Sequence, residues 1–261
     1  MSTDTLVRAD EGTVVHLFDG PFVTIGSCRY AVPEGSKRLL AYVALRQGRV
    51  ERRRAAGALW PIGDDHRAAG NLRSALWRLR GAGIDIMTTD KWSMELCHGV
   101  QVDAQLTLDW ANRLIADTVQ AGDLAMRGNR IDALDLLPGW YEDWAIVERE
   151  RIRQRMLHAL EALSRRLSGV DRHAEAVEVA MAVVNAEPLR ESAQRVLLEA
   201  HAAERNWVEV RRSYLCYRDL VRRELGVEPA HDLTRFVQQT RGTPTRVPAG
   251  PAPLARLSGT G

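Results

Sequence analysis

The chain has 261 residues, 45% hydrophobic and 27% charged, so it is long enough for about two globular domains and too apolar for intrinsic disorder. No apolar run approaches the roughly 18 residues of a membrane helix, and no signal peptide is recognisable, so we expect a cytoplasmic protein without membrane contact. Cys28, Cys97 and Cys216 are odd in number and widely spaced, which argues against a disulfide framework or a cysteine metal site.

The net charge of +2 conceals one strongly basic region. Residues 37–80 contain 11 Lys and Arg against 3 acids, a local charge of +8, whereas residues 104–242 contain 20 basic and 22 acidic side chains. A basic region suits a phosphate backbone, because its cations displace condensed counterions on binding. A GC-rich coding sequence would also raise the arginine content, but it does not explain the clustering.

The first predicted elements are a small sheet and two helices. Residues 14–33 are rich in β-branched and aromatic side chains interrupted by turn signals, which predicts a small antiparallel sheet. A helix follows that Ser36 can cap and Gly48 ends. A second helix is expected over residues 52–60 and is closed by Pro61.

A third helix is predicted over residues 65–80, with Asp64 or Asp65 as its N-cap. A leucine stripe from Leu72 to Leu79 would face the core. The opposite face carries side chains that suit DNA, because Arg pairs with guanine and Asn with adenine. The alternative is that this helix is an ordinary solvated surface helix or binds a protein partner. The candidate DNA-binding residues of this recognition helix are Arg67, Asn71, Arg73, Ser74 and Arg78.

Two β-prone runs within residues 84–97 flank Thr89, Asp90 and Lys91, which predicts a hairpin. Three helices followed by a hairpin are typical of a winged helix. In that architecture the third helix lies in the major groove, while the second helix and the wing approach the DNA backbone. The candidate backbone contacts are Arg52, Arg53, Arg54, Thr89 and Lys91.

The second half of the chain is predicted to be all-helical. Residues 141–167 form one long amphipathic pattern, for which a core helix is favoured over a dimerising coiled coil because the heptads are imperfect. Residues 171–207 resemble a tetratricopeptide (TPR) unit, and residues 171–176 align with residues 205–210, 34 residues further on. Such repeats present surfaces for peptides or proteins.

Several stretches resemble known regulators. Residues 36–60, 71–83 and 86–96 resemble the winged helix of OmpR/PhoB-type response regulators, and RRELGVEPAHDL, residues 222–233, resembles a signature of the Streptomyces antibiotic regulatory protein (SARP) family. The resemblance implies a mainly α fold, a winged helix-turn-helix with a small antiparallel sheet followed by a TPR-like bacterial transcriptional activation domain. The expected domains are residues 1–103 and 104–242, followed by a disordered tail over residues 243–261.

The resemblance also implies a function. Members of this family are nucleoid-associated activators of antibiotic and other secondary-metabolite genes that bind double-stranded promoter DNA at direct repeats. Their helical domain would self-associate as a homodimer or contact RNA polymerase. Two alternatives stay open. One is a TPR-like interaction scaffold whose winged helix does not bind DNA specifically. The other is an enzyme or a small-molecule sensor that uses the concave helical surface, and a sensor would need a pocket with converging polar groups.

Two features depart from the family pattern. Trp77 is bulky where relatives carry small or polar side chains, and we expect it in the core or a domain interface, with a thymine methyl or deoxyribose contact as the alternative. Residues 128–144 are shorter, and more interrupted by Pro and Gly, than the extended helix that the family pattern predicts at this place. No catalytic grouping or cofactor motif is apparent, and the run Asp64 to His66 suits an N-cap better than a metal ligand set, so we expect neither catalytic nor metal-binding residues.

Overall fold

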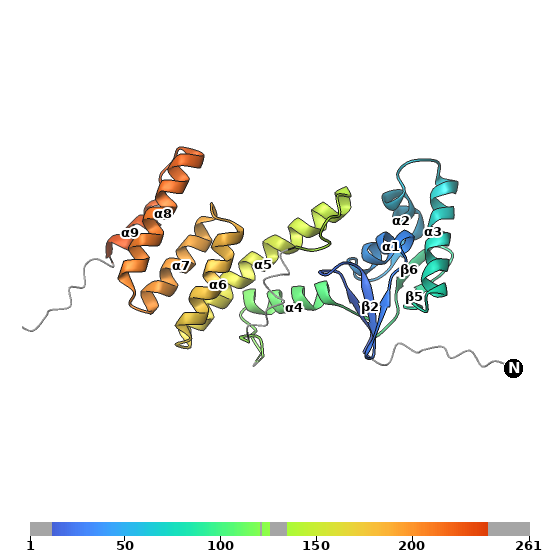
Figure 1. The fold of residues 1–261 in the computed structure, drawn as a ribbon, viewed down its shortest axis with the longest axis horizontal. Coiled ribbons are helices and arrows are strands. Elements are labelled where there is room, and N and C mark those ends of the chain that lie inside the picture. The colour runs from blue at the N-terminus through green and yellow to red at the C-terminus, as the bar shows by residue number, and fades with distance from the viewer. Residues whose placement is uncertain (1–11, 121, 126–134, 240–261) are drawn as a thin grey trace, which may run out of the picture.

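The structure is a computed structural model that describes residues 12–120, 122–125 and 135–239. It confirms the mainly α fold class, with small sheets confined to the N-terminal half. The sheets and first helices occupy one end of the molecule, and a stack of helices extends to the other end (Figure 1). The predicted tail over residues 243–261 lies outside the described residues. None of the described helices combines the length and apolar character that crossing a bilayer requires.

The first sheet contains four short strands, in the order β3, β2, β1, β7. β1 pairs antiparallel with β2, as does β2 with β3, which confirms the predicted small sheet, and β7 adds a parallel edge that the sequence did not indicate. Val15 and Val23 are paired across β1 and β2 and face the core. The strands are β1 (Val14–His16), β2 (Phe22–Ile25), β3 (Cys28–Ala31) and β7 (Gln101–Val102).

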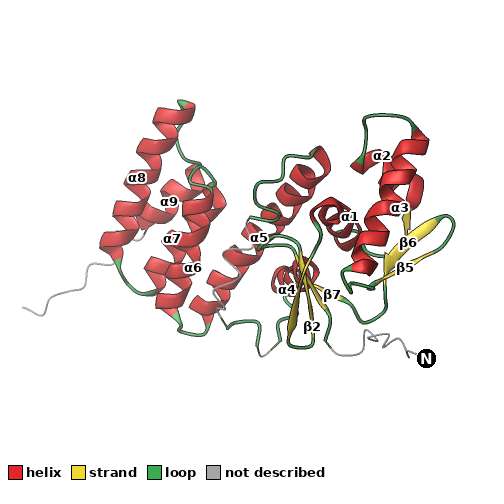
Figure 2. Ribbon diagram, turned by 45° about the vertical axis from the view of Figure 1, so that its right-hand side comes forward, coloured by secondary structure: helices red, strands yellow, loops and turns green. Residues whose placement is uncertain are grey.

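Three helices and a second sheet complete the winged helix. The helices are α1 (Glu34–Ala44), α2 (Arg52–Leu59) and α3 (Asp65–Gly81). The second sheet has the order β4, β6, β5, and its β5–β6 hairpin is the predicted wing (Figure 2). Its strands are β4 (Val50–Glu51), β5 (Met87–Thr89) and β6 (Ser93–Leu96).

The start of α1 differs from the prediction. The helix begins at Glu34 after Pro33, and Ser36 does not cap it. Ser36 is instead buried, and its hydroxyl donates to the carbonyl oxygen of Ala75 on α3 at 2.8 Å. A serine in the first turn of a helix can satisfy its hydroxyl on a neighbouring helix when the two pack closely, so the cap prediction was wrong.

The start of α3 agrees with the prediction. The Asp64 side chain accepts a hydrogen bond from the backbone N–H of Arg67 at 2.7 Å, as an N-cap residue does. The leucine stripe from Leu72 to Leu79 is buried. Trp77, however, is 74% exposed, because the 100° step of the helix places it opposite that stripe, so the expectation of a core or interface position was wrong.

A seam of specific contacts joins the winged helix to the helical half. Asp103, the first residue of α4 (Asp103–Ile115), accepts a hydrogen bond from the backbone N–H of Leu17 at 2.9 Å. The N–H of Leu137 donates to the carbonyl oxygen of Leu17 at 3.2 Å. Tyr42 of α1 meets the edge of Trp144 at a ring-centroid distance of 5.3 Å. One hydrophobic core therefore runs from β1 into the helical stack.

The part of residues 128–144 that the structure describes is tightly held. Leu136 and Leu137 are buried, and the Arg149 guanidinium donates to the carbonyl oxygens of Leu136 at 2.6 Å and Trp140 at 3.0 Å. Arg149 thus supplies hydrogen bonds to backbone that belongs to no helix or strand, as buried carbonyl groups require.

Five helices form the stack beyond the seam. The long predicted helix is present as α5, and its apolar face packs within the molecule against α4, α6 and α7, which favours the core-helix interpretation over a coiled coil. The 34-residue repeat is also visible, since Asp171 and Arg205 have φ values of 60° and 61° at equivalent turns. The helices are α5 (Asp143–Gly169), α6 (His173–Ala186), α7 (Glu191–Ala203), α8 (Trp207–Leu225) and α9 (His231–Gln239).

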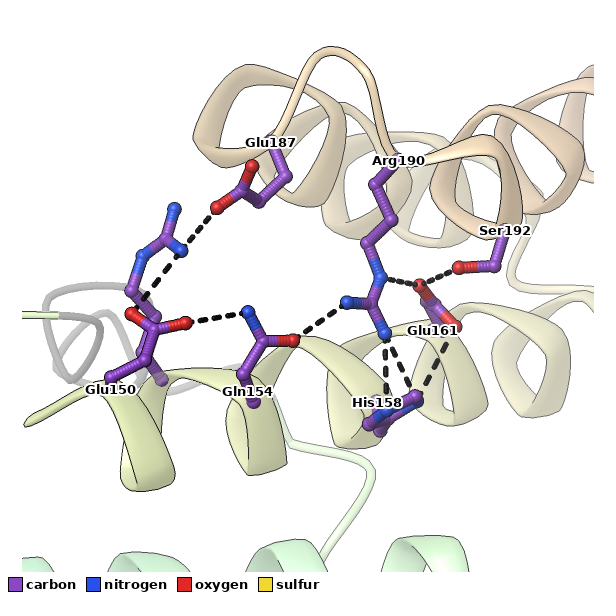
Figure 3. Close-up of polar contacts among 8 residues, drawn as sticks. Glu150, Gln154, His158, Glu161, Glu187, Arg190 and Ser192 are labelled. Atoms are coloured by element: carbon purple, nitrogen blue, oxygen red, sulfur yellow. Dashed lines mark hydrogen bonds and ion pairs between the residues drawn. The ribbon is translucent and has the colours of Figure 1, made fainter. Parts of the chain in front are cut away.

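A polar network fixes α5 to the turn between α6 and α7 (Figure 3). The Glu161 carboxylate, with its side chain only 6% exposed, accepts hydrogen bonds from Arg190 at 2.6 Å and from the Ser192 hydroxyl at 2.7 Å. The other end of the Arg190 guanidinium contacts Gln154 at 2.9 Å and His158 at 3.1 Å. His158 is therefore part of a structural network in this stack.

Candidate nucleic-acid interface

The outer surface of α3 is the first component of the candidate interface. Helical geometry divides its polar residues between two sides, because Arg67 and Arg78 lie three turns apart on the side toward α1 while Arg73 lies toward α2. Arg67, Arg73, Ser74 and Arg78 are exposed, and Asn71 is half-buried between them and the core. Trp77 lies between the two sides, at the outermost point of the helix.

A groove between α2, α3 and the tip of the wing is the second component. It has a volume of about 560 Å³. Four cationic side chains line it, together with two carboxylates, Asp65 and Asp90. Its floor is formed by the small or apolar residues Ala56, Ala68 and Leu72. The cationic residues are Arg52, Arg53, Arg73 and Lys91.

Several of the candidate cationic side chains already form hydrogen bonds or ion pairs within the chain. Arg78 donates to the carbonyl oxygen of Gly35 on α1 at 3.2 Å, and Gly35 allows this approach because a Cβ there would lie 2.8 Å from the Arg78 Nη2 atom. Arg53 pairs with Asp65 at 2.9 Å. Arg52 donates to the carbonyl oxygen of Asp90 at 3.2 Å. These side chains position α1, α3 and the wing as well as adding positive charge.

Other candidate cations are free of such contacts. Among the residues that the structure describes, the guanidinium groups of Arg54, Arg67 and Arg73 form neither a hydrogen bond nor an ion pair. The Lys91 ammonium group lies 4.9 Å from the ring centroid of exposed Trp92 and has no carboxylate partner. These four cations on α2, α3 and the wing are therefore available to an anionic partner without breaking an existing ion pair.

The tip of the wing is ordered by Asp90. Its Oδ1 atom accepts hydrogen bonds from the backbone N–H groups of Trp92 and Ser93, each at 2.7 Å. The N–H groups of Ser93 and then Trp92, together with the Ser93 hydroxyl and Arg49, lower the pKa of this carboxyl from 3.8 to about 2. The ionised carboxylate thus shapes the turn that exposes Lys91.

Sequence reasoning missed four residues of this region. Arg49 binds the Asp90 carboxylate and donates to the Ser93 hydroxyl at 3.0 Å, and Arg80 donates to the Thr89 hydroxyl at 3.3 Å, so Thr89 is already engaged. His66 lines the groove, and Trp92 is 69% exposed at the wing tip. The charges of Arg49 and Arg80 were visible in the sequence, but their partners lie on strands whose register only the structure defines.

The comparisons with known proteins agree with this arrangement. Residues 116–241 match the family model described as the bacterial transcriptional activator domain. The chain also resembles the solved structure of Mycobacterium tuberculosis EmbR in complex with a low affinity phosphopeptide, with a TM-score of 0.66 and 15% sequence identity over 90% of this chain and 66% of that chain. No curated protein matches the sequence significantly.

The chain carries a bacterial transcriptional activator domain. This domain follows an N-terminal winged helix, in the order that the resemblance to the SARP family implied. The family is one of transcription regulators rather than enzymes. At 15% identity the likeness to EmbR concerns the fold, and the chain spans just under two thirds of the EmbR chain. The basic groove belongs to the winged helix, outside the matched activator domain.

Proposed function

We propose that this chain is a sequence-specific activator that binds double-stranded promoter DNA through α3 and the wing. The observation that carries the proposal is a set of cations on three adjacent elements that have no ion pair among the described residues: Arg54 on α2, Arg67 and Arg73 on α3, and Lys91 on the wing. A phosphate backbone supplies the anionic partner that this set lacks.

The dimensions and chemistry of α3 support this mode of binding. Its 17 residues span about 25 Å, and Trp77 on its outer surface is 74% exposed among the described residues. A helix of this kind fits the major groove, where Arg67, Arg73 and Asn71 would approach base edges. Ser74 would contact phosphate. Arg78 is held by α1 and would add charge from its present position rather than reach across the groove.

The backbone contacts divide between the second helix and the wing. Arg54 on α2 has no partner in the described part of the chain, while Arg52 and Arg53 reach the groove from the first turn of the same helix. Lys91 and Thr89 would approach an adjacent backbone from the wing, with Trp92 beside them. We retain residues 1–103 as the DNA-binding domain and residues 104–242 as the activation domain, with α4 beginning at Asp103.

The helical half would contact the transcription machinery. A groove of about 740 Å³ between α8 and α9 exposes Val208 and half-exposes Leu215 beside Trp207, and the Arg211 guanidinium on its rim has no ion pair among the described residues. Apolar side chains flanked by free positive charge suit an acidic amphipathic segment of RNA polymerase. By family resemblance we also propose binding to direct repeats, with self-association of protomers, and control of antibiotic biosynthesis genes in the cytoplasmic nucleoid.

Fluorescence anisotropy tests the DNA-binding step, with a duplex that the wild-type protein selects from random sequence. Arg73→Ala should weaken binding to this duplex by about 1–3 kcal/mol and relax specificity, because a base contact is lost. Arg54→Ala should weaken binding to selected and unrelated duplexes alike, and reduce the slope of log K against log salt by about 1. Arg212→Ala, a change on α8, is the matched control and should leave affinity unchanged.

The same titrations can contradict the proposal. If Arg73→Ala and Arg212→Ala bind the selected duplex with equal affinity, α3 does not read DNA. If affinity does not depend on salt, the free cations do not contact phosphate. In either case the interaction-scaffold alternative would replace the proposed function.

A further inference from the structure

A second polar pocket lies at the seam between the two halves, away from the DNA-binding groove. It has a volume of about 500 Å³, within the range of small-molecule sites. Residues from the segment that follows α1, from α4 and from α5 line it, so both halves of the chain contribute. The lining residues are Leu45, Gln47, Gln105, Leu108, Asn112, Arg151 and Arg155.

Helical spacing directs the polar side chains of this pocket toward one another. Gln105, Leu108 and Asn112 follow one face of α4 at i, i+3 and i+7 spacing. Arg151 and Arg155 are four residues apart and share one face of α5. Gln154 and His158, which bind Arg190 in the polar network, lie three and seven residues after Arg151 and therefore border this face of α5 (Figure 3). Two helix faces therefore present hydrogen-bonding groups to one cavity.

The pocket contains hydrogen-bond donors that the acceptors of its own residues do not satisfy. Arg155 donates from Nε to the Asn112 Oδ1 atom at 2.8 Å, which leaves both of its terminal nitrogens and the Asn112 amide nitrogen without partners among the described residues. Arg151 donates from Nε to Glu148 at 2.8 Å and likewise retains its terminal nitrogens. The Gln47 amide has no partner in the described part of the chain. Planar guanidinium groups of this kind bind carboxylate and phosphate with two parallel hydrogen bonds.

The charge around the pocket is unbalanced. No carboxylate lines the cavity, and the side-chain hydrogen bond of Arg155 is to a neutral amide. Arg151 and Arg155 repel each other across one turn of α5, and Glu148 lies next to Arg151 only. Leu45 and Leu108 add an apolar wall. The combination suits a small molecule with an anionic oxygen group on an apolar body.

We propose that this seam pocket binds a small organic anion, with Arg155 and Arg151 holding its carboxylate or phosphate group and Leu45 and Leu108 packing against its apolar part. The proposal is independent of the DNA-binding function, since no residue of the basic groove takes part. A small-molecule sensor needs a polar pocket, and the proposal names the chemical class of ligand for the seam pocket.

Two aromatic anions and a neutral analogue test the proposal. Phenyl phosphate, benzoate and benzamide are titrated separately into the full chain at constant ionic strength, while NMR follows the side-chain amide signals of Gln47, Gln105 and Asn112. We expect one of the anions to shift these signals saturably at millimolar concentration, and which of them does so identifies the phosphate or the carboxylate class. Benzamide, which has the same ring without the charge, should bind at least tenfold more weakly.

Matched arginine variants complete the test. Arg155→Gln keeps a side chain that can bond Asn112 but removes the charge, and should weaken anion binding at least tenfold. Arg165→Gln, which removes an α5 arginine that pairs with Glu199 outside the pocket, should bind as the wild type does. The proposal is overturned if neither anion shifts the signals below 10 mM, if benzamide binds equally well, or if Arg155→Gln leaves the affinity unchanged.

Discussion

At the scale of single residues, the basic side chains of the winged helix divide into two groups. Arg78, Arg80 and Arg52 hold other elements through hydrogen bonds to Gly35, Thr89 and the Asp90 carbonyl group. A second group, which includes Arg67 and Arg73, has no protein partner among the described residues. Sequence alone could not separate the groups, because all of these arginines lie within one basic run and the acceptors are backbone or wing atoms.

Gly70 gives a prediction about the outer surface of α3. Glycine within a helix costs about 1 kcal/mol relative to alanine, and a Cβ at Gly70 would lie no closer than 3.8 Å to its neighbours, from Arg73 Nη2. Gly70→Ala should therefore raise the free energy of unfolding in urea by about 0.5–1 kcal/mol. Affinity for the selected duplex should fall, because the added methyl group occupies the surface that approaches DNA. Increased stability with unchanged affinity would place the DNA elsewhere.

Asp90 gives a prediction about pH. Hydrogen bonds from the backbone of Ser93 and Trp92 lower its pKa from 3.8 to about 2 in the folded wing. Because the folded pKa lies below the unfolded value, the ionised carboxylate stabilises the wing above pH 4, and this contribution is lost as the pH falls toward 2. The backbone amide signals of Trp92 and Ser93 should titrate by NMR with a midpoint near pH 2. A midpoint near 4, or the same titration in Asp90→Asn, would contradict this role.

At the scale of elements, hydrophobic periodicity was sufficient to predict α3 and α5. The leucine stripe of α3 and the long pattern of α5 predicted helices within a few residues of their observed bounds, because each buries one face against neighbours. Ser36 and Trp77 misled for a related reason. Each has a favourable local interpretation, as a cap or as a core residue. The packing of α1 against α3 overrides it for Ser36, and the position of Trp77 opposite the leucine stripe overrides it for Trp77.

The polar network of α5 gives a prediction at this scale. Arg190→Ala would leave the nearly buried Glu161 carboxylate without its arginine, so the free energy of unfolding should fall by about 3 kcal/mol. Arg165→Ala is a matched control on α5, since its pair with Glu199 is about half exposed and should be worth less than about 1 kcal/mol. Urea unfolding followed by circular dichroism measures both changes. Equal losses in the two variants would show that the network does not anchor the turn before α7.

At the scale of the whole molecule, the seam joins the winged helix to the helical stack. Asp103 and Glu142 connect α4 and the start of α5 to the winged helix, through the N–H of Leu17 and through Arg38 at 2.6 Å. The halves could be recognised from sequence, since their charge and periodicity differ. The contacts between them could not, because they join residues as far apart in sequence as Leu17 and Asp103.

Sequencing of the DNA that the protein retains tests the central claim most directly. Fragmented genomic DNA from the source organism is incubated with the full chain at about 150 mM salt, and the retained fragments are sequenced, with an Arg67→Ala and Arg73→Ala double variant in parallel. The wild type should enrich fragments that share one motif, and the variant should lose that motif while retaining weak binding without sequence preference. An identical motif with both proteins, or no motif with the wild type, would contradict DNA recognition by α3.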